Sequence, residues 1–228
     1  MRLTRARLQG IYRALHRTYG FQHWWPARAK FEMMAGAVLV QNTNWNNAAR
    51  AIAVLKRERL LAPSKLAGLP LPELAKRIRS SGTHRVKAKR LRALSRWLVE
   101  QGGIAKAGQL RTDELRRSLL TVHGIGPETA DCILVYAYAR PLFIADAYAR
   151  RFLSRLGFDS VTGGYEPLRV EIESKLDEGA GFFNEFHALI VRHAKHTCRA
   201  EPACERCVFV RRCGYTASRV TARRTAGR

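Results

Sequence analysis

The sequence predicts an all-α protein. Three observations support this fold class: apolar residues recur at helical spacing through most of the chain, runs of β-branched residues are few, and short segments rich in Gly, Pro, Asn or Asp separate the periodic stretches. An apolar content of 46%, with 17 glycines and 8 prolines, is typical of a chain that packs a core, so a fully disordered protein is excluded.

The expected helices are bounded by residues that start or stop helices. Asn44 and Asp146 suit the N-cap positions of the helices that follow them, and Gly102-Gly103 ends a long basic helix. Pro63-Ser64 is expected in a loop, and residues 141–144 in a short extended connector. The helices are expected over residues 4–18, 29–40, 44–57, 71–79, 85–101, 112–121, 127–138, 147–156, 165–177 and 182–196.

No segment of the sequence is suited to crossing a membrane. The longest apolar run, Met33 to Val40, is far shorter than the roughly 18 to 20 residues that a bilayer span needs. The N-terminal residues also lack the pattern of a signal peptide. We therefore expect a soluble cytoplasmic protein, associated with the nucleoid if the source is bacterial.

The chain is strongly basic, with 41 Lys and Arg against 18 Asp and Glu and a formal net charge of +23. Such a charge repels itself unless a polyanion neutralises it, which indicates nucleic acid as a partner. Residues 76–96 carry basic side chains and no acid, and the tail adds Arg219, Arg223, Arg224 and Arg228. These separate stripes favour nucleic acid over a membrane surface, and a solvated Arg-rich surface is the alternative.

Four of the five cysteines lie close together near the C-terminus, as Cys198, Cys204, Cys207 and Cys213. Four thiolates at this spacing suit a [4Fe-4S] cluster or a tetrahedral zinc ion. The single internal Cys-x2-Cys favours iron–sulfur, and structural zinc is the alternative. Cys132 stands alone and is expected to be a small buried hydrophobe.

A tight turn between two helices is predicted at His123-Gly124-Ile125-Gly126, with Pro127 opening the second helix. The glycines permit the turn and expose backbone N–H groups, and the helix N-terminus that follows favours a phosphate. The sequence therefore predicts phosphate binding without base readout, unless the turn is only a capped corner between helices.

Over residues 25–213 the chain resembles the helix-hairpin-helix DNA glycosylases of the endonuclease III superfamily. Three motifs carry the resemblance: HGIGPETA at 123–130, Ala145-Asp146-Ala147 and the four-cysteine loop. The resemblance implies two helical domains flanking a DNA-binding cleft, with the damaged nucleotide turned out of the duplex. The implied segments are an N-terminal helix (1–28) joining the second domain, a helical barrel (29–138), C-terminal helices with the cluster loop (139–213) and a basic tail (214–228).

The resemblance implies a damaged-DNA partner, and the hairpin and the basic stretch 76–96 indicate which residues bind it. The partner would be double-stranded DNA containing a damaged base, bound by a monomer through the hairpin and a basic helix. The implied DNA-binding residues are His123, Gly124, Ile125, Gly126, Thr129, Lys87 and Lys89.

The resemblance makes Asp146 catalytic. An ionised carboxylate beneath the sugar stabilises the oxocarbenium charge and orients the attacking water, although a helix N-cap is the simpler role. Relatives that also cut the strand carry a Lys amine in the helix after the hairpin, where this chain has Glu128. We therefore expect base removal alone. Glu128 is expected either to be an acid at the rim of the pocket or only to place a favourable negative charge at the helix N-terminus.

Aromatic residues point to the substrate. The purine-stacking residues of the 3-methyladenine DNA glycosylase branch are similar to four residues here: Trp24, Trp25, Pro26 and Trp45. Electron-poor alkylated purines stack well on an indole ring. Gln41 falls where relatives fill the gap left by the extruded base. Ordinary core packing is the alternative for the tryptophans.

Two other functions share most of these motifs. A bifunctional glycosylase and abasic-site lyase acting on oxidised pyrimidines would require the missing amine. A non-catalytic, metal-bearing DNA-binding protein would need neither Asp146 nor the tryptophans.

Overall fold

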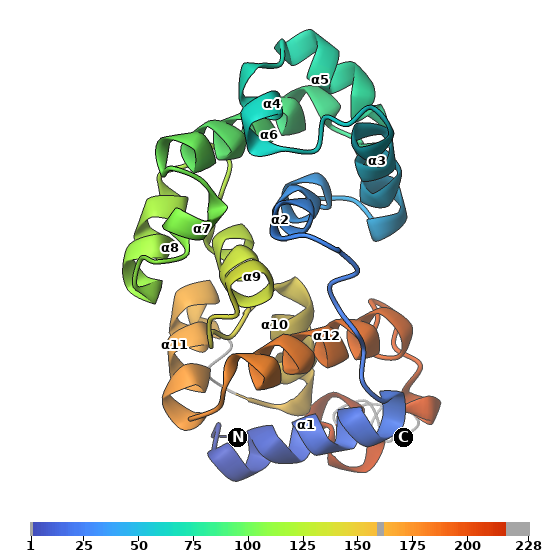
Figure 1. Cartoon of the computed structure of the whole chain (residues 1–228). Coiled ribbons are helices and arrows are strands. Elements are labelled where there is room, and N and C mark those ends of the chain that lie inside the picture. Colours follow the sequence, from blue (N-terminus) through green and yellow to red (C-terminus); the bar gives the residue numbers. More distant parts are fainter. Residues whose placement is uncertain (1, 159–161, 218–228) are drawn as a thin grey trace. The chain divides into compact units, whose positions relative to one another are not determined.

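The computed structural model describes residues 2–158 and 162–217, and every regular element in those ranges is helical (Figure 1). The predicted all-α class is confirmed there. Residues 141–144 form an irregular connector rather than a strand. The four arginines of the expected basic tail lie outside the described residues. Within the described ranges, no helix is long and apolar enough to cross a membrane.

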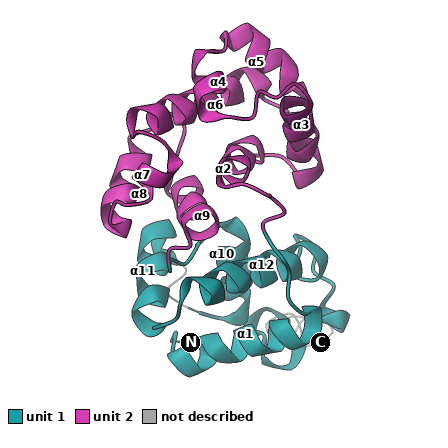
Figure 2. Cartoon of the chain, in the orientation of Figure 1, with its two compact units in different colours: residues 1–24, 141–228 teal, residues 25–140 magenta. Residues whose placement is uncertain are grey.

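The chain divides into two compact units (Figure 2). Unit 1 combines residues 1–24 with 141–228, and unit 2 consists of Trp25–Arg140. The boundaries expected from the sequence lie after residues 28 and 138. Trp24 and Trp25 therefore belong to different units.

Unit 2 is built around one apolar helix, α2 (Lys30–Leu39), which is buried from Phe31 to Leu39 and packs against α3, α6 and α9. Apart from Glu32, which pairs with Lys56 at 2.7 Å, this stretch has no polar side chain, so no face of the helix suits water. The other elements of the unit are α3 (Trp45–Arg57), α4 (Pro63–Gly68), α5 (Leu71–Arg77), the 3₁₀ turn η1 (Arg79–Ser81), α6 (His84–Glu100), α7 (Ile104–Ala107), α8 (Thr112–Leu120) and α9 (Pro127–Tyr138).

The Pro63-Ser64 segment corrects one prediction. It begins the short helix α4 instead of lying in a loop, with Pro63 in the first turn. Proline is well suited to that position, because its fixed φ matches the helix and its missing N–H would have no helical partner there. α4 then packs on α6 and buries Leu66.

Unit 1 packs α12 (Ala180–His196) against both α10 (Ala147–Leu156) and α1 (Arg5–Tyr19). Its core includes Phe152, Phe186 and Leu189. The remaining elements are α11 (Tyr165–Lys175) and the 3₁₀ turns η3 (Cys204–Arg206) and η4 (Val210–Arg212).

Both predicted N-caps are confirmed. The Asn44 side chain accepts the Asn47 N–H at 3.0 Å, and the Asp146 carboxylate accepts the Ala149 N–H at 2.7 Å. Each bond satisfies one N–H that the first helical turn leaves without a partner.

Candidate functional site

The predicted hairpin connects α8 and α9 in unit 2. Gly124 has φ +81°, a conformation that glycine adopts without steric cost, and the Ile125 N–H donates to the Val122 carbonyl at 3.0 Å. The Ile125 side chain is buried and anchors the turn, so only its backbone is suited to a phosphate. Gly126 then opens α9 without a side-chain cap, which leaves the positive end of that helix facing outward.

A buried ion pair fixes the two helices of the hairpin to each other. Arg116 on α8 binds Asp131 on α9 through two hydrogen bonds of 2.6 and 3.1 Å. Asp131 is completely buried, so removing its cation would leave an uncompensated charge in the core. The ion pair therefore fixes the positions of the two helices that flank the turn.

A surface groove of about 680 Å³ lies over the hairpin. Its lining brings Gln41 together with predicted site residues of the distant hairpin segment: His123, Gly124, Ile125, Gly126, Glu128 and Thr129. Arg90 from α6 also lines it, a residue that no sequence motif marks as part of the site. An exposed helix N-terminus beside a guanidinium favours an anion, and the Glu128 carboxylate, which also lines the groove, opposes it.

Gln41 is bonded to the hairpin itself. Its Nε2 donates to the Gly124 carbonyl at 3.2 Å and to Thr129 Oγ1 at 2.9 Å. Its Oε1 accepts from Arg90 at 2.6 Å. The residue expected to enter the DNA and the loop expected to bind phosphate are therefore parts of one network.

Lys87 corrects a second prediction. Its side chain is 1% exposed, and its ammonium donates to the carbonyls of Leu39 (2.8 Å) and Ser81. Burial, followed by the neighbouring Arg90 charge, lowers the pKa of Lys87. Lys87 therefore ties α6 to the end of α2 and to the η1 turn and cannot reach a phosphate in solvent.

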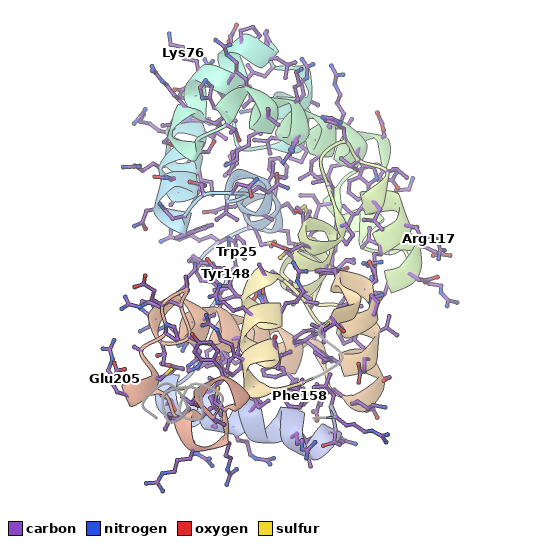
Figure 3. The ribbon with its side chains drawn as sticks, turned by 180° about the vertical axis from the view of Figure 1, so that it is seen from behind. Trp25, Lys76, Arg117, Tyr148, Phe158 and Glu205 are labelled. Atoms are coloured by element: carbon purple, nitrogen blue, oxygen red, sulfur yellow. The ribbon has the colours of Figure 1, made fainter. Side chains whose placement is uncertain are left out.

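Lys89 points to solvent, as expected for a phosphate-binding residue. It shares a second groove of about 750 Å³ with Lys76, Arg79, Arg85 and the apolar side chains of α5. Lys76 lies at the end of unit 2 remote from Trp25 (Figure 3). The basic groove is therefore separate from the aromatic residues described next.

Trp25 and Trp45 pack together in unit 2, edge to face, with ring centroids 5.3 Å apart. Gly36 of α2 makes this possible, because a Cβ there would lie 3.1 Å from Trp25 Nε1 and 3.2 Å from the Trp45 ring. Tyr136 adds a third ring 5.4 Å from Trp25. Both indoles are only partly buried, and Pro26 is exposed beside them.

Tyr136 was missed in the sequence. It lies on α9 at a spacing of four residues from Cys132 and eight from Glu128, so the three side chains follow one stripe of the helix. None of the three is buried, which corrects the expectation that Cys132 is a core residue. Helical spacing from Glu128 was the signal that could have identified Tyr136.

In unit 1, Asp146 is only 6% exposed and its two oxygens have different partners. One oxygen caps α10, and the other lies 3.4 Å from Nε2 of His187 on α12. A carboxylate held by a helix N-terminus and an imidazole is fixed in orientation. His187, 41 positions away in sequence, was not predicted.

The four clustered cysteines all belong to unit 1. Arg155 lies against two of them: its guanidinium donates to Cys198 Sγ at 3.5 Å, and its carbonyl accepts from Cys213 Sγ at 3.1 Å. Cys207 Sγ lies 3.7 Å from Nε2 of the buried His193. Among the described residues, no three metal-binding side chains converge on one point suited to a single ion.

The four thiols also influence one another electrostatically. Burial is the main cause that raises the pKa of Cys207, and the charges of Cys198, Cys213 and Cys204 raise it further. A bound metal centre would remove this repulsion by neutralising the thiolates. The four thiols and the adjacent guanidinium match an anionic thiolate-bound centre in donor type, while the described side chains do not converge on one point.

Throughout the described residues the regular elements are helical, and the α8–α9 hairpin presents a helix N-terminus in a groove that Arg90 also lines. This arrangement is that of a helix-hairpin-helix protein. Residues 35–178 match the model of the HhH-GPD superfamily base excision DNA repair proteins. The chain therefore belongs to this superfamily of DNA glycosylases, that of endonuclease III.

Three relatives illustrate the similarity. A Methanocaldococcus jannaschii protein, named as a candidate DNA repair glycosylase, is 40% identical over 201 residues, which cover 86% of this chain and 91% of the relative. A non-covalent endonuclease III–DNA complex has the same fold, with a TM-score of 0.77 at 23% identity over 96% of this chain and 99% of that one. The 3-methyladenine DNA glycosylase MagIII of H. pylori, bound to 1,N6-ethenoadenine, matches with a TM-score of 0.68 at 29% identity over 85% and 98%.

Proposed function

We propose that the protein removes alkylated purines from double-stranded DNA by hydrolysing the N-glycosidic bond, without cutting the strand. The aromatic cluster of Trp25, Trp45 and Tyr136 carries this proposal. An electron-poor purine gains about 1 to 3 kcal/mol from stacking on such rings and needs little hydrogen-bond readout. The similarity to a glycosylase bound to an ethenoadenine base supports the same substrate class.

Asp146 is the proposed catalytic carboxylate. Leaving of the base builds positive charge on the sugar, and a fixed negative charge stabilises that transition state. The cap to Ala149 and the contact with His187 hold the carboxylate in place, so it does not reorganise during the reaction. The carboxylate also orients the water that attacks C1′.

The composition of α9 supports the proposal that the protein does not cut the strand. A lyase needs an amine that attacks C1′ and forms an imine, and α9 contains no lysine. Glu128 occupies the first turn of that helix instead, at the edge of the groove over the hairpin. A carboxylate cannot form the imine, so the product should be an intact abasic strand.

The proposed cofactor is a [4Fe-4S] cluster held by Cys198, Cys204, Cys207 and Cys213, with structural zinc as the alternative. The thiolates and the Arg155 guanidinium suit an anionic cluster, which would fold a segment that has only two short 3₁₀ turns. Broad absorbance near roughly 400 nm, together with iron and sulfide in the purified protein, is the expected observation. Stoichiometric zinc without iron would select the alternative.

Duplexes that each carry one lesion test the activity. We expect release of 3-methyladenine or 7-methylguanine, strand breaks only after alkali, and no borohydride-trapped adduct. A trapped adduct on thymine glycol DNA would instead identify an endonuclease III-type lyase. If no base is released from any lesion while the duplexes still bind, the protein is a non-catalytic DNA-binding protein.

The aromatic cluster has its own test. Trp45→Leu should reduce alkylpurine release by a factor that corresponds to about 1 to 3 kcal/mol, and far more than it weakens binding of undamaged DNA. Trp97→Leu is the matched control, since Trp97 is buried beside Ser118 outside the cluster and its loss should affect stability without changing that ratio. Equal losses in base release and in nonspecific DNA binding for Trp45→Leu would show that the cluster does not bind the substrate base.

A further inference from the structure

The amide of Gln41 has a fixed orientation. Arg90 is a donor only, so the Gln41 atom facing it must be the carbonyl oxygen, and the bond is 2.6 Å long. The Nε2 group then faces two acceptors, the Gly124 carbonyl and Thr129 Oγ1. Both N–H groups of the amide are therefore used within the protein, and one lone pair of Oε1 remains for an outside partner.

Packing against the hairpin holds Arg90 in this position. A Cβ on Gly124 would lie 2.2 Å from Arg90 Cγ and 2.7 Å from Nε, so the arginine stem fills the space that the missing side chain leaves. Arg90 Nε is buried and has no hydrogen-bond partner among the described residues. An unpaired buried donor costs free energy. Arg90 therefore keeps a position that suits its contacts with Gln41 and the hairpin, at the expense of a hydrogen bond from its own Nε.

We propose that Arg90 is a positioning residue that locks Gln41 onto the hairpin, so that phosphate binding by the hairpin and entry of Gln41 into the duplex occur as one event. This rests on the proposed role of Gln41 as the residue that fills the gap in the DNA. In the locked state Gln41 meets the orphaned base as a hydrogen-bond acceptor. The stiff amide also reaches the gap without losing side-chain freedom at that step.

The alternative is that Arg90 only stabilises the hairpin. In that case its loss would lower thermal stability and DNA affinity independently of Gln41. The locking role predicts instead that the two residues act as a unit, so that removing the second after the first has no further effect.

The experiment uses duplexes with an abasic-site analogue opposite 2-aminopurine, whose fluorescence reports the environment of the orphaned base. We expect Arg90→Met to reproduce the altered fluorescence of Gln41→Ala and a similar loss of affinity, about tenfold. The double variant should be no weaker than either single one. Arg90→Lys, which also only donates, should recover part of the wild-type signal.

Two further variants keep the test decisive. Arg92→Met removes the same charge from α6, and its effect on affinity should multiply with that of Gln41→Ala. Thr129→Val removes an acceptor of Gln41 without changing charge or shape, and should give a partial form of the Gln41→Ala signal if Arg90→Met does not fold.

The outcomes separate this proposal from the proposed function. Multiplicative losses for Arg90→Met and Gln41→Ala, or a wild-type fluorescence signal in Arg90→Met, overturn the lock. The lock also fails if Gln41→Ala leaves the fluorescence unchanged, even when alkylpurines are still released. Conversely, coupled losses without any alkylpurine release leave the lock in place and reject the substrate.

Discussion

At the scale of single residues, Asp146 combines a structural role with the proposed chemical one. Its carboxylate caps α10 and is oriented by His187. Asparagine caps helices about as well as aspartate, so Asp146→Asn should fold normally while losing the charge. We expect base release under single-turnover conditions to fall roughly 100-fold or more with DNA affinity retained.

Asp146→Ala is the comparison for that variant. It removes both the charge and the cap, so it should lose about 1 kcal/mol of stability in addition to activity. A near wild-type rate of base release for Asp146→Asn would assign Asp146 to capping alone.

Glu185 is a second buried carboxylate with an electrostatic cost. One oxygen accepts the Gln22 N–H at 2.9 Å, and the other has no hydrogen-bond partner among the described residues. Burial raises the pKa of Glu185, against the opposing effects of the Gln22 N–H and of His16 and His23.

The raised pKa predicts a pH-dependent stability. The folded state holds the proton more tightly than the unfolded state, so this group favours folding below the unfolded pKa of about 4.3, and the contribution is lost as pH rises through the folded pKa. Glu185→Gln cannot ionise, so its melting temperature relative to wild type should increase between about pH 4.5 and 7.5. A constant difference across that range would show that burial of the charge has no cost.

At the scale of elements, the hairpin depends on Gly124. Alanine there must adopt φ near +81° and place its Cβ against the stem of Arg90. Gly124→Ala should therefore weaken binding of both undamaged and abasic DNA, and Gly126→Ala is the milder control, because a Cβ at Gly126 meets nothing. Equal affinities for the two variants would contradict the tight fit between Gly124 and Arg90.

The elements themselves were largely predictable from sequence. The caps at Asn44 and Asp146 and the start of α9 at Pro127 depend on residues within a few positions of one another, and such local signals are visible in a single sequence. The short helix α4 was missed because six residues are too few to show a helical period.

At the scale of the whole molecule, the charge of +23 predicts strongly salt-dependent DNA binding. Lys87 and Lys89 give a matched pair on one helix, since the first is buried and the second exposed. Lys89→Gln should reduce the slope of log affinity against log salt by about 1, whereas Lys87→Gln should leave the slope unchanged. Thermal unfolding provides the control, because the Lys87 variant should lose stability. A smaller slope for Lys87→Gln would place its ammonium on the DNA.

The sequence by itself determined the helical class, the helix caps, the turn at Gly124 and the clustering of four cysteines. All of these depend on residues close together in the chain. Tertiary structure alone decided that Lys87 is buried and that His187 contacts Asp146. It also decided that Gln41, 83 positions before Gly124, is bonded directly to the hairpin and accepts a hydrogen bond from Arg90. Helical periodicity states which face of each helix is apolar, but not which face of another helix it meets, and those long-range contacts are where the proposed site is assembled.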